Sequence, residues 1–271
     1  MQGRLSPILN NKIQEFPWES WQKEFEVSSE LGFKLMEWTL DHYRLYENPL
    51  MTKAGQKEIL RLSNKYNIKI PSLTGDCFMQ APFWKASQSS ASKLKQDFLS
   101  VCHASKKNDI QLIVVPLVDN GRLDTRSQED ELVEHLLSIC DDLRSMKLMI
   151  LFEIDFDPIE VARFISRLPS DVFGINYDIG NSAALGFNVS EEMSAYGNRV
   201  CNVHIKDRVL GGGTVPLLSG DANFPQMFAE LSHLNYSGNF ILQTARAKNN
   251  DHSRVLSQYF QLTKQWIADY A

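Results

Sequence analysis

The chain has 271 residues, and its 28 Lys and Arg residues against 33 Asp and Glu residues give a formal net charge of −5. This acidic balance argues against a groove that neutralises many nucleic-acid phosphates. The 43% content of apolar residues excludes a disordered or fibrous chain. A length near about 250 residues is typical of one closed α/β barrel as well as of two smaller domains.

The sequence also lacks the features of a membrane or secreted protein. Its longest apolar runs, 112–118 and 148–152, are far shorter than the about 20 residues that span a bilayer. Residues 1–4 do not start a signal-peptide hydrophobic region. The four cysteines are isolated, which is typical of reduced thiols. We therefore expect a cytoplasmic protein with a small-molecule substrate and no nucleic-acid or membrane partner, either as a monomer or as a homo-oligomer.

Short, β-branched apolar runs recur along the chain and predict strands. Seven are visible, at 33–38, 68–73, 110–116, 148–153, 173–178, 200–206 and 240–244. Residues 2–5, immediately before Ser6 and Pro7, would end an additional first strand. Eight strands give about 34 residues per unit, which is the size of a βα repeat.

Amphipathic segments separate these strands and predict helices. The clearest is 129–143, and the others are 18–31, 52–66, 90–105, 158–168, 224–234 and 253–268, with a short helix near 190–196. Strands that are apolar on both faces and alternate with helices predict a parallel sheet covered by helices. Eight such units predict a (β/α)8 TIM barrel, one domain over residues 1–271. The first strand is followed by no G-x-G-x-x-G, which argues against a dinucleotide-binding fold.

Polar side chains occupy three consecutive strand ends, where the catalytic groups of a TIM barrel lie. Glu153 ends the fifth strand, Asp178 the sixth and His204 the seventh. Strand alternation places them on the same side as Asn176 and Asn202. Two carboxylates and an imidazole are typical ligands of Mn²⁺, Mg²⁺, Co²⁺ or Zn²⁺. We predict a divalent metal site here, against the alternative that these residues only end strands and bind loops.

Six short motifs stand at or near the predicted strand ends. They are Gln2-Gly3-Arg4-Leu5-Ser6, Glu37-Trp38, Glu153, Asp178-Ile179-Gly180-Asn181, His204-Ile205-Lys206-Asp207 and Ile241-Leu242-Gln243-Thr244. These motifs resemble those of the xylose isomerase-like TIM barrels, and within them the sugar phosphate isomerases/epimerases, including hexulose-6-phosphate isomerase-like proteins. The resemblance covers nearly the whole chain.

The resemblance implies a divalent ion held by Glu153, Asp178 and His204, with a fourth ligand from Gln243. The family has a Glu at that fourth position, and there the two glutamates also move a proton between substrate carbons. The amide of Gln243 can offer its oxygen to a metal but cannot accept a proton near pH 7. A single base, Glu153, suffices for aldose–ketose isomerisation through an enediolate, whereas inversion of a carbon needs a group on each face.

Other residues could complete the site. Glu37, Asp76 or Lys206 could replace the missing carboxylate, although Glu37 suits a salt-bridged strand end equally well. Asp76 is also expected to contact substrate. Arg208, in the glycine-rich loop 207–214, is expected to bind a substrate phosphate or, alternatively, to lie in a flexible solvated loop.

Arg246, Arg4 and Asn181 are further candidates for binding substrate oxygens. The aromatic loop 76–84 suits a lid over the barrel mouth, subunit packing, or ordinary packing over the rim.

Together these features predict a divalent-metal-dependent isomerase, of the EC 5 type, or an epimerase that acts on a small sugar or sugar phosphate. One alternative is a catalytically degenerate barrel that binds a sugar or polyol without turnover. Another is a metal-dependent lyase or dehydratase acting on a keto acid. An apurinic-site endonuclease would share the fold, but it needs more histidines at strand ends and a less acidic surface than this sequence offers.

Overall fold

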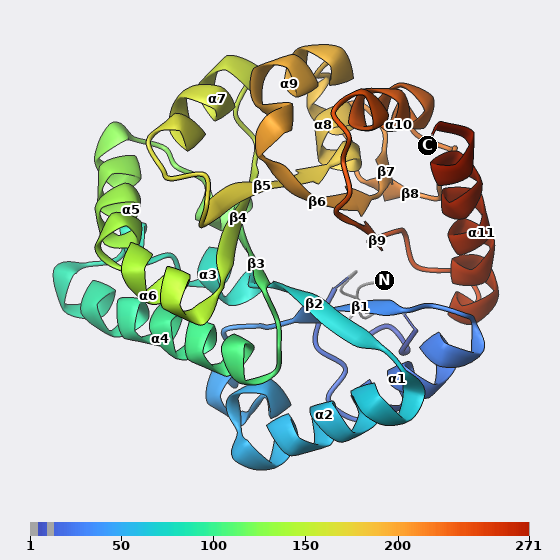
Figure 1. Ribbon diagram of the computed structural model, residues 1–271, viewed down its shortest axis with the longest axis horizontal. Coiled ribbons are helices and arrows are strands. Elements are labelled where there is room, and N and C mark those ends of the chain that lie inside the picture. Colours follow the sequence, from blue (N-terminus) through green and yellow to red (C-terminus); the bar gives the residue numbers. More distant parts are fainter. Residues whose placement is uncertain (1–4, 10–13, 271) are drawn as a thin grey trace.

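The computed structural model describes residues 5–9 and 14–270, and these form a nearly closed parallel barrel with helices around it (Figure 1). Its strands are hydrogen-bonded in the order β1-β2-β3-β4-β5-β6-β9. They are β1 (Leu35–Thr39), β2 (Lys69–Thr74), β3 (Leu112–Leu117), β4 (Met149–Ile154), β5 (Phe173–Asp178), β6 (Val200–Ile205) and β9 (Asn239–Leu242). The seven strands visible in the sequence are confirmed, and their ends differ from the expected ones by at most two residues.

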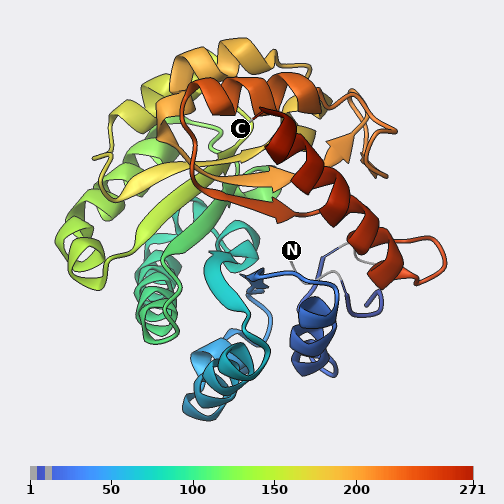
Figure 2. The same cartoon turned by 45° about the vertical axis from the view of Figure 1, so that its right-hand side comes forward.

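Helices surround the strands, most of them in an outer layer, as Figure 2 shows. They are α1 (Trp21–Glu30), α2 (Lys53–Tyr66), α3 (Asp76–Gln80), α4 (Gln88–Lys107), α5 (Arg126–Ser138), α6 (Cys140–Met146), α7 (Pro158–Ser166), α8 (Ile179–Leu185), α9 (Val189–Tyr196), α10 (Phe224–His233) and α11 (His252–Tyr270). The predicted alternation of strands and helices, and with it the TIM-barrel fold class, is therefore confirmed.

Short polar side chains start several of these helices. The Thr52 hydroxyl accepts a hydrogen bond from the Gly55 N–H at the start of α2, and the Asp157 carboxylate accepts from Ile159 and Glu160 at the start of α7. Such caps satisfy backbone N–H groups that have no partner inside the helix. The caps thus fix the residue at which each of these helices begins.

The expected helix over 129–143 is divided into α5 and α6. Ile139, a β-branched residue, lies between them with φ −110° and ψ 8°, and its N–H bonds to the Leu136 carbonyl in a tighter turn. A continuous apolar face does not reveal such a break, because both helices present their apolar residues to the same core.

The aromatic loop 76–84 packs against the barrel rim. It folds into α3 and the 3-10 turn Phe83–Lys85, and it buries Phe78, Phe83 and Trp84. The rings of Phe78 and Phe83 contact Phe98 of α4, and the Trp84 indole N–H donates to the Gly121 carbonyl. Of the three expected roles, packing over the rim agrees with these contacts.

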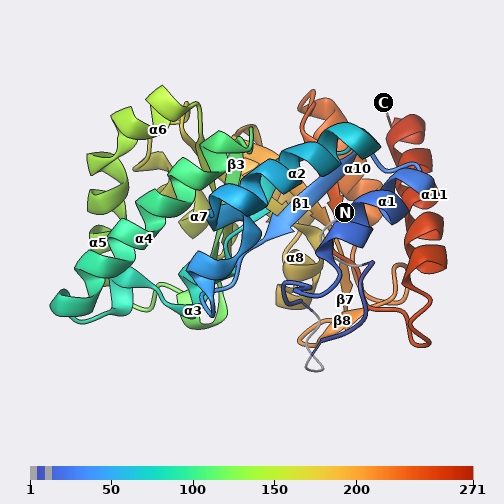
Figure 3. The ribbon, with the colours of Figure 1, turned by 90° about the horizontal axis from the view of Figure 1, so that it is seen from below.

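The additional first strand, expected at 2–5, lies outside the described residues except for Leu5, which is in a bend. The N–H groups of Leu5 and Ser6 donate to the buried carboxylate of Glu24 in α1. The described strands β1 and β9 are the two edges of the sheet. Figure 3 shows α3 and the small ribbon β7 (Asp207–Arg208) and β8 (Thr214–Val215) at one end of the barrel.

Candidate active site at the carboxyl ends of the strands

Three adjacent strands direct polar side chains into the barrel at their carboxyl ends. Glu153 is near the end of β4, Asp178 is the last residue of β5, and His204 lies in β6. Asp178 and His204 are direct partners in the parallel register of β5 and β6. Residues paired in this way point to the same side of a sheet, so the side chains of Asp178 and His204 share one face.

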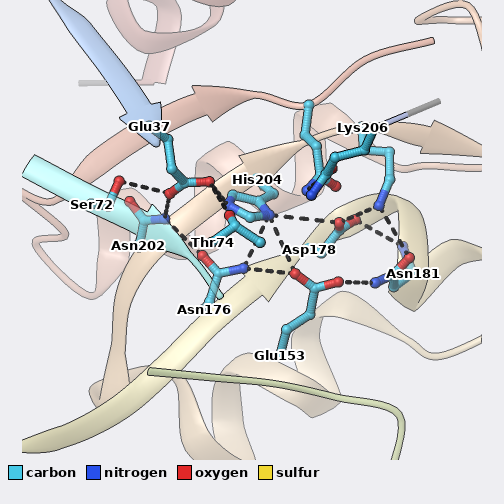
Figure 4. A network of polar contacts seen from close by, with 12 residues as sticks. Glu37, Ser72, Thr74, Glu153, Asn176, Asp178, Asn181, Asn202, His204 and Lys206 are labelled. Carbon is cyan, nitrogen blue, oxygen red and sulfur yellow. Dashed lines mark hydrogen bonds and ion pairs between the residues drawn. The ribbon is translucent and has the colours of Figure 1, made fainter. Parts of the chain in front are cut away.

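The ligand atoms of Glu153, Asp178 and His204 all lie within 4.8 Å of one another (Figure 4). His204 Nδ1 is 3.4 Å from Glu153 Oε2 and 3.9 Å from Asp178 Oδ2. All three residues are buried. Among the described residues this is the one group of acidic, His or Cys side chains with the geometry of a metal site.

A second carboxylate lies on the other edge of the His204 ring. Glu37 Oε1 accepts a hydrogen bond from His204 Nε2 at 2.8 Å, and both side chains are fully buried. The Glu37 carboxylate also accepts from the hydroxyls of Ser72 and Thr74 and from the amide of Asn202. His204 therefore lies between Glu37 on one edge and Glu153 with Asp178 on the other.

These contacts shift the ionisation of the buried groups. Burial alone would raise the pKa of Glu37, but the charge and hydrogen bond of His204 lower it to about 2. Burial alone would lower the pKa of His204, but the carboxylates of Glu37 and Glu153 raise it to about 10. A cation bound at Nδ1 must therefore displace a proton from the imidazole.

Glu153 is ionised and hydrogen-bonded. Burial would raise its pKa, but the hydrogen bond of His204 and the charge of Lys206 hold that pKa below the ordinary value of 4.5. Its Oε2 accepts from Asn176 at 3.1 Å, and its Oε1 accepts from Asn181 at 2.6 Å. The carboxylate is thus ionised at neutral pH and held in place by two amide groups.

A cavity of about 360 Å³ opens next to Glu153. Its polar lining includes Asp155, Asn181, Lys206 and Arg208. Lys206 Nζ lies 2.8 Å from Asp178 Oδ2, and Arg208 donates to the side-chain oxygen of Asn181 at 2.8 Å. The structure thus brings three of the sequence-predicted residues, Asn181, Lys206 and Arg208, to the edge of the candidate site.

Gln243 lies just beyond the end of β9, where its N–H bonds to the Ile205 carbonyl of β6. Its side chain is buried, and among the described residues its Oε1 has no hydrogen-bond partner. Its Nε2 is 3.4 Å from Gln14 Oε1, and Gln14 Nε2 donates to Asp76 at 2.6 Å. Asp76 and Gln243 are therefore connected through one amide side chain.

Arg246 and Arg4 are the remaining predicted substrate residues. A guanidinium nitrogen of Arg246 donates to the Ser6 carbonyl, which links the loop after β9 to the segment before α1. Another contact joins Arg246 to His252 at 3.4 Å. Arg4 lies outside the described residues.

Strand parity places Asn176 and Asn202 on the face of the predicted ligands, but their role in holding the site, and that of the hydroxyls of Ser72 and Thr74, was not predicted. The Asn202 side-chain amide donates to both Glu37 and Asn176 Oδ1, and the hydroxyls of Ser72 and Thr74 donate to Glu37 from β2. A signal was present: Asn176 and Asn202 each stand two residues before a predicted ligand in otherwise apolar strands. What the sequence does not show is which of these polar groups face one another across the barrel.

The donor set fits a divalent cation. Two carboxylates and a neutral imidazole nitrogen are oxygen and nitrogen ligands suited to Mn²⁺, Mg²⁺, Co²⁺ or Zn²⁺. The buried Oε1 of Gln243, which finds no hydrogen-bond partner in the part of the chain that the structure describes, is the type of atom that a bound cation or substrate would satisfy.

Comparison with known proteins agrees with this architecture. The family model described as "Xylose isomerase-like TIM barrel" matches residues 25–262. A Haemophilus influenzae protein named "Putative L-ribulose-5-phosphate 3-epimerase SgbU" is 23% identical over 268 residues, which cover 92% of this chain and 90% of that protein.

Solved structures share the fold at low identity. D-psicose 3-epimerase from Clostridium cellulolyticum H10, solved with D-tagatose, superposes with a TM-score of 0.74 at 12% identity, over 91% of this chain and 93% of the other. The IolI protein with a bound zinc atom superposes with a TM-score of 0.77 at 14% identity, over 93% of this chain and 94% of the other.

None of the helices in the described part of this chain has the length and apolar character needed to cross a membrane.

Proposed function

The chain belongs to the xylose isomerase-like TIM barrel family, and on that basis we propose that it is a divalent-metal-dependent isomerase or epimerase of a small sugar or sugar phosphate. The observation that carries this proposal is the convergence of Glu153, Asp178 and His204 within 4.8 Å at adjacent strand ends. The names of the relatives, which are sugar and sugar-phosphate epimerases, support the substrate class.

Glu153, Asp178 and His204 would hold the cation, and the Oε1 of Gln243 would be a fourth ligand. A divalent cation at this point supplies positive charge next to substrate oxygens and so stabilises an enediolate. Three protein carboxylates, including Glu37, already lie around His204, so the negative charge that attracts such an ion is built into the barrel.

Glu153 is the proton acceptor in this proposal. Its carboxylate is ionised at neutral pH and is oriented by Asn181, and it lines the cavity next to the site. Gln243 stands where the family has its second Glu, and its amide cannot take a proton. One base on one face of the substrate favours aldose–ketose isomerisation, whereas epimerisation requires a further proton donor.

Arg208 is proposed to bind the end of the substrate away from the reacting carbons, and Lys206, whose Nζ lies 2.8 Å from Asp178 Oδ2, to bind a substrate oxygen near the cation. Both line the cavity, and no described carboxylate lies within the 4.0 Å of an ion pair from Arg208. An arginine whose partners are carbonyl oxygens keeps its charge available for a phosphate. We expect Arg208→Met to raise the KM for a phosphorylated sugar more than the KM for the free sugar.

The first test is metal content by elemental analysis. Wild-type protein, purified without a metal-affinity tag and loaded with Mn²⁺, Co²⁺, Zn²⁺ or Mg²⁺, is expected to retain one ion per chain, and Asp178→Asn is expected to lose it. Asp178→Asn is suitable because an amide oxygen can still accept the Asn181 N–H that caps α8. Folded wild-type protein that retains no ion would contradict the proposal.

The second test is proton exchange with solvent. Loaded enzyme is incubated in D₂O with L-ribulose 5-phosphate or D-psicose, and ¹H NMR locates the deuterium. Deuterium at C1 indicates isomerisation, and deuterium at C3 indicates epimerisation. Loaded enzyme that binds these sugars without exchange would support the sugar-binding alternative, and release of water from a keto-acid substrate would support the dehydratase alternative.

A further inference from the structure

Glu37 lies behind His204, away from the cavity. It is 1% exposed, and its Oε1 accepts both His204 Nε2 at 2.8 Å and the Thr74 hydroxyl at 2.7 Å. Its Oε2 accepts the Ser72 hydroxyl at 2.6 Å and the Asn202 amide at 3.2 Å. Both oxygens are therefore occupied by protein donors, and the imidazole separates them from Glu153 and Asp178.

The same contacts continue in a closed ring of buried side chains. Asn202 Nδ2 donates to Glu37 and, at 2.7 Å, to Asn176 Oδ1. This contact orients the amide of Asn176, whose Nδ2 lies 3.1 Å from both Glu153 Oε2 and His204 Nδ1. Figure 4 shows these contacts, and each of them restricts the rotation of the side chains that it joins.

We propose that Glu37 is a positioning residue that holds His204 with its proton on Nε2 and its Nδ1 directed at the cation proposed above. A carboxylate can only accept hydrogen bonds, so the nitrogen facing Glu37 must carry a hydrogen. The other nitrogen, Nδ1, faces Glu153 and Asp178, and a cation bound there would displace its proton while Nε2 keeps its own. Carboxylate partners of this kind fix the orientation of metal-binding histidines and raise their basicity.

This role differs from the proton transfer that the sequence suggested for Glu37. A group with four protein donors, shielded by an imidazole, cannot reach a substrate carbon in the cavity. The inference rests on the proposed function, because it assigns Glu37 to the same metal site. It also goes beyond that function, because no ligand atom of the cation comes from Glu37.

The test compares Glu37→Gln with Glu129→Gln, a matched control. Glu129 is an equally buried carboxylate, but it binds arginines outside the barrel. Zn²⁺ affinity is measured by competition with a chelating dye, and the exchange of the His204 Nε2–H with water is measured by ¹⁵N-histidine NMR in metal-free protein. His204→Gln identifies the signal.

Glu37→Gln is expected to bind Zn²⁺ about 10–100-fold more weakly than wild type and to exchange its Nε2–H faster. Glu129→Gln is expected to leave both quantities unchanged. Thr74→Val removes one hydrogen-bond donor to Glu37. It is expected to weaken Zn²⁺ binding and to speed the Nε2–H exchange by smaller amounts, and it replaces Glu37→Gln as the test if that variant does not fold.

Wild-type Zn²⁺ affinity together with unchanged exchange in Glu37→Gln and Thr74→Val would overturn the inference. Absence of Zn²⁺, Mn²⁺, Co²⁺ and Mg²⁺ binding by folded wild-type protein would instead overturn the proposed function. In that case the exchange of the Nε2–H still decides whether Glu37 holds His204.

Discussion

Two clusters of charged side chains differ in their balance of charge. At the strand ends, three carboxylates face one imidazole and one ammonium group: Glu37, Glu153, Asp178, His204 and Lys206. Outside the barrel, between α5 and α7, three carboxylates face three guanidinium groups: Glu129, Asp130, Glu160, Arg126, Arg163 and Arg167.

In the second cluster the positive and negative charges are equal in number, and their ion pairs join α5 to α7 and to Arg167 at its end. The first cluster is buried and has more carboxylates than cationic groups, an arrangement that costs free energy unless a proton or a cation offsets it. An imbalance of buried charge, more than the number of ion pairs, distinguishes a site that accepts a ligand from a structural network.

The largest expected effect comes from removing the imidazole of the first cluster. His204→Ala leaves the carboxylate of Glu37 buried without its partner, and breaking a buried pair costs roughly 3–5 kcal/mol. Urea denaturation of the metal-free protein at pH 7 measures this loss. The double variant Glu37→Gln/His204→Ala should recover part of it, and a loss below about 1 kcal/mol in the single variant would contradict the pairing.

Asp207 belongs to neither cluster, and it is a fully buried carboxylate without an ion-pair partner in the described structure. It accepts the N–H groups of Ser219, Gly220 and Ala222 and thus anchors the loop that follows β7. Asp207→Ala should cost about 1–3 kcal/mol and expose 209–222 to limited proteolysis. The affinity of the Asp207→Ala variant for Zn²⁺ should stay unchanged. A large drop in that affinity would show that Asp207 contributes to the metal site.

Glu129 gives the pH dependence of the balanced cluster. Burial would raise its pKa, but the hydrogen bonds of Arg163 and Arg167 lower it from 4.5 to about 2. Because the folded pKa is the lower one, this contribution to stability is present above pH 4.5 and is lost as the pH falls toward 2. Screening of the partly exposed arginines limits it to about 1–2 kcal/mol.

Denaturation curves between pH 2 and pH 7 check this expectation, with Glu129→Gln as the comparison. The stability of wild type should fall more steeply with acid than that of the variant. Parallel curves for the two proteins would show that the arginines do not stabilise the ionised Glu129.

The smallest expected effect is that of adding charge to the unbalanced cluster. Gln243→Glu supplies a further carboxylate, so the affinity for Mn²⁺ should rise roughly tenfold. Gln243→Met, which removes the amide oxygen, should weaken binding instead. If Gln243→Glu also introduces deuterium at C3 of the ketose, the native Gln limits the enzyme to one base. An unchanged affinity for Mn²⁺ in both variants would exclude Gln243 from the metal site.

Part of the candidate site could be predicted because it is local in sequence. Asp178 and His204 stand at the ends of apolar runs, and the period of two in a strand fixes which side chains share a face. The Glu37 contact with His204 could not be predicted in the same way, since it joins residues 167 positions apart. Nor could the contact of Arg246 with Ser6, which depends on where the loop after β9 meets the N-terminal segment.

The alternation of strands and helices follows from the sequence alone, because hydrophobic period and strand parity are local properties. This alternation implies the barrel and the end of the barrel at which the polar residues lie. Only the tertiary structure decided which polar groups face one another. Closure of the sheet brings β1 and β2 across from β6, so that Glu37, Ser72 and Thr74 meet His204. Partner choice inside a barrel depends on register and rotamer, and these follow from the packing of all the strands at once.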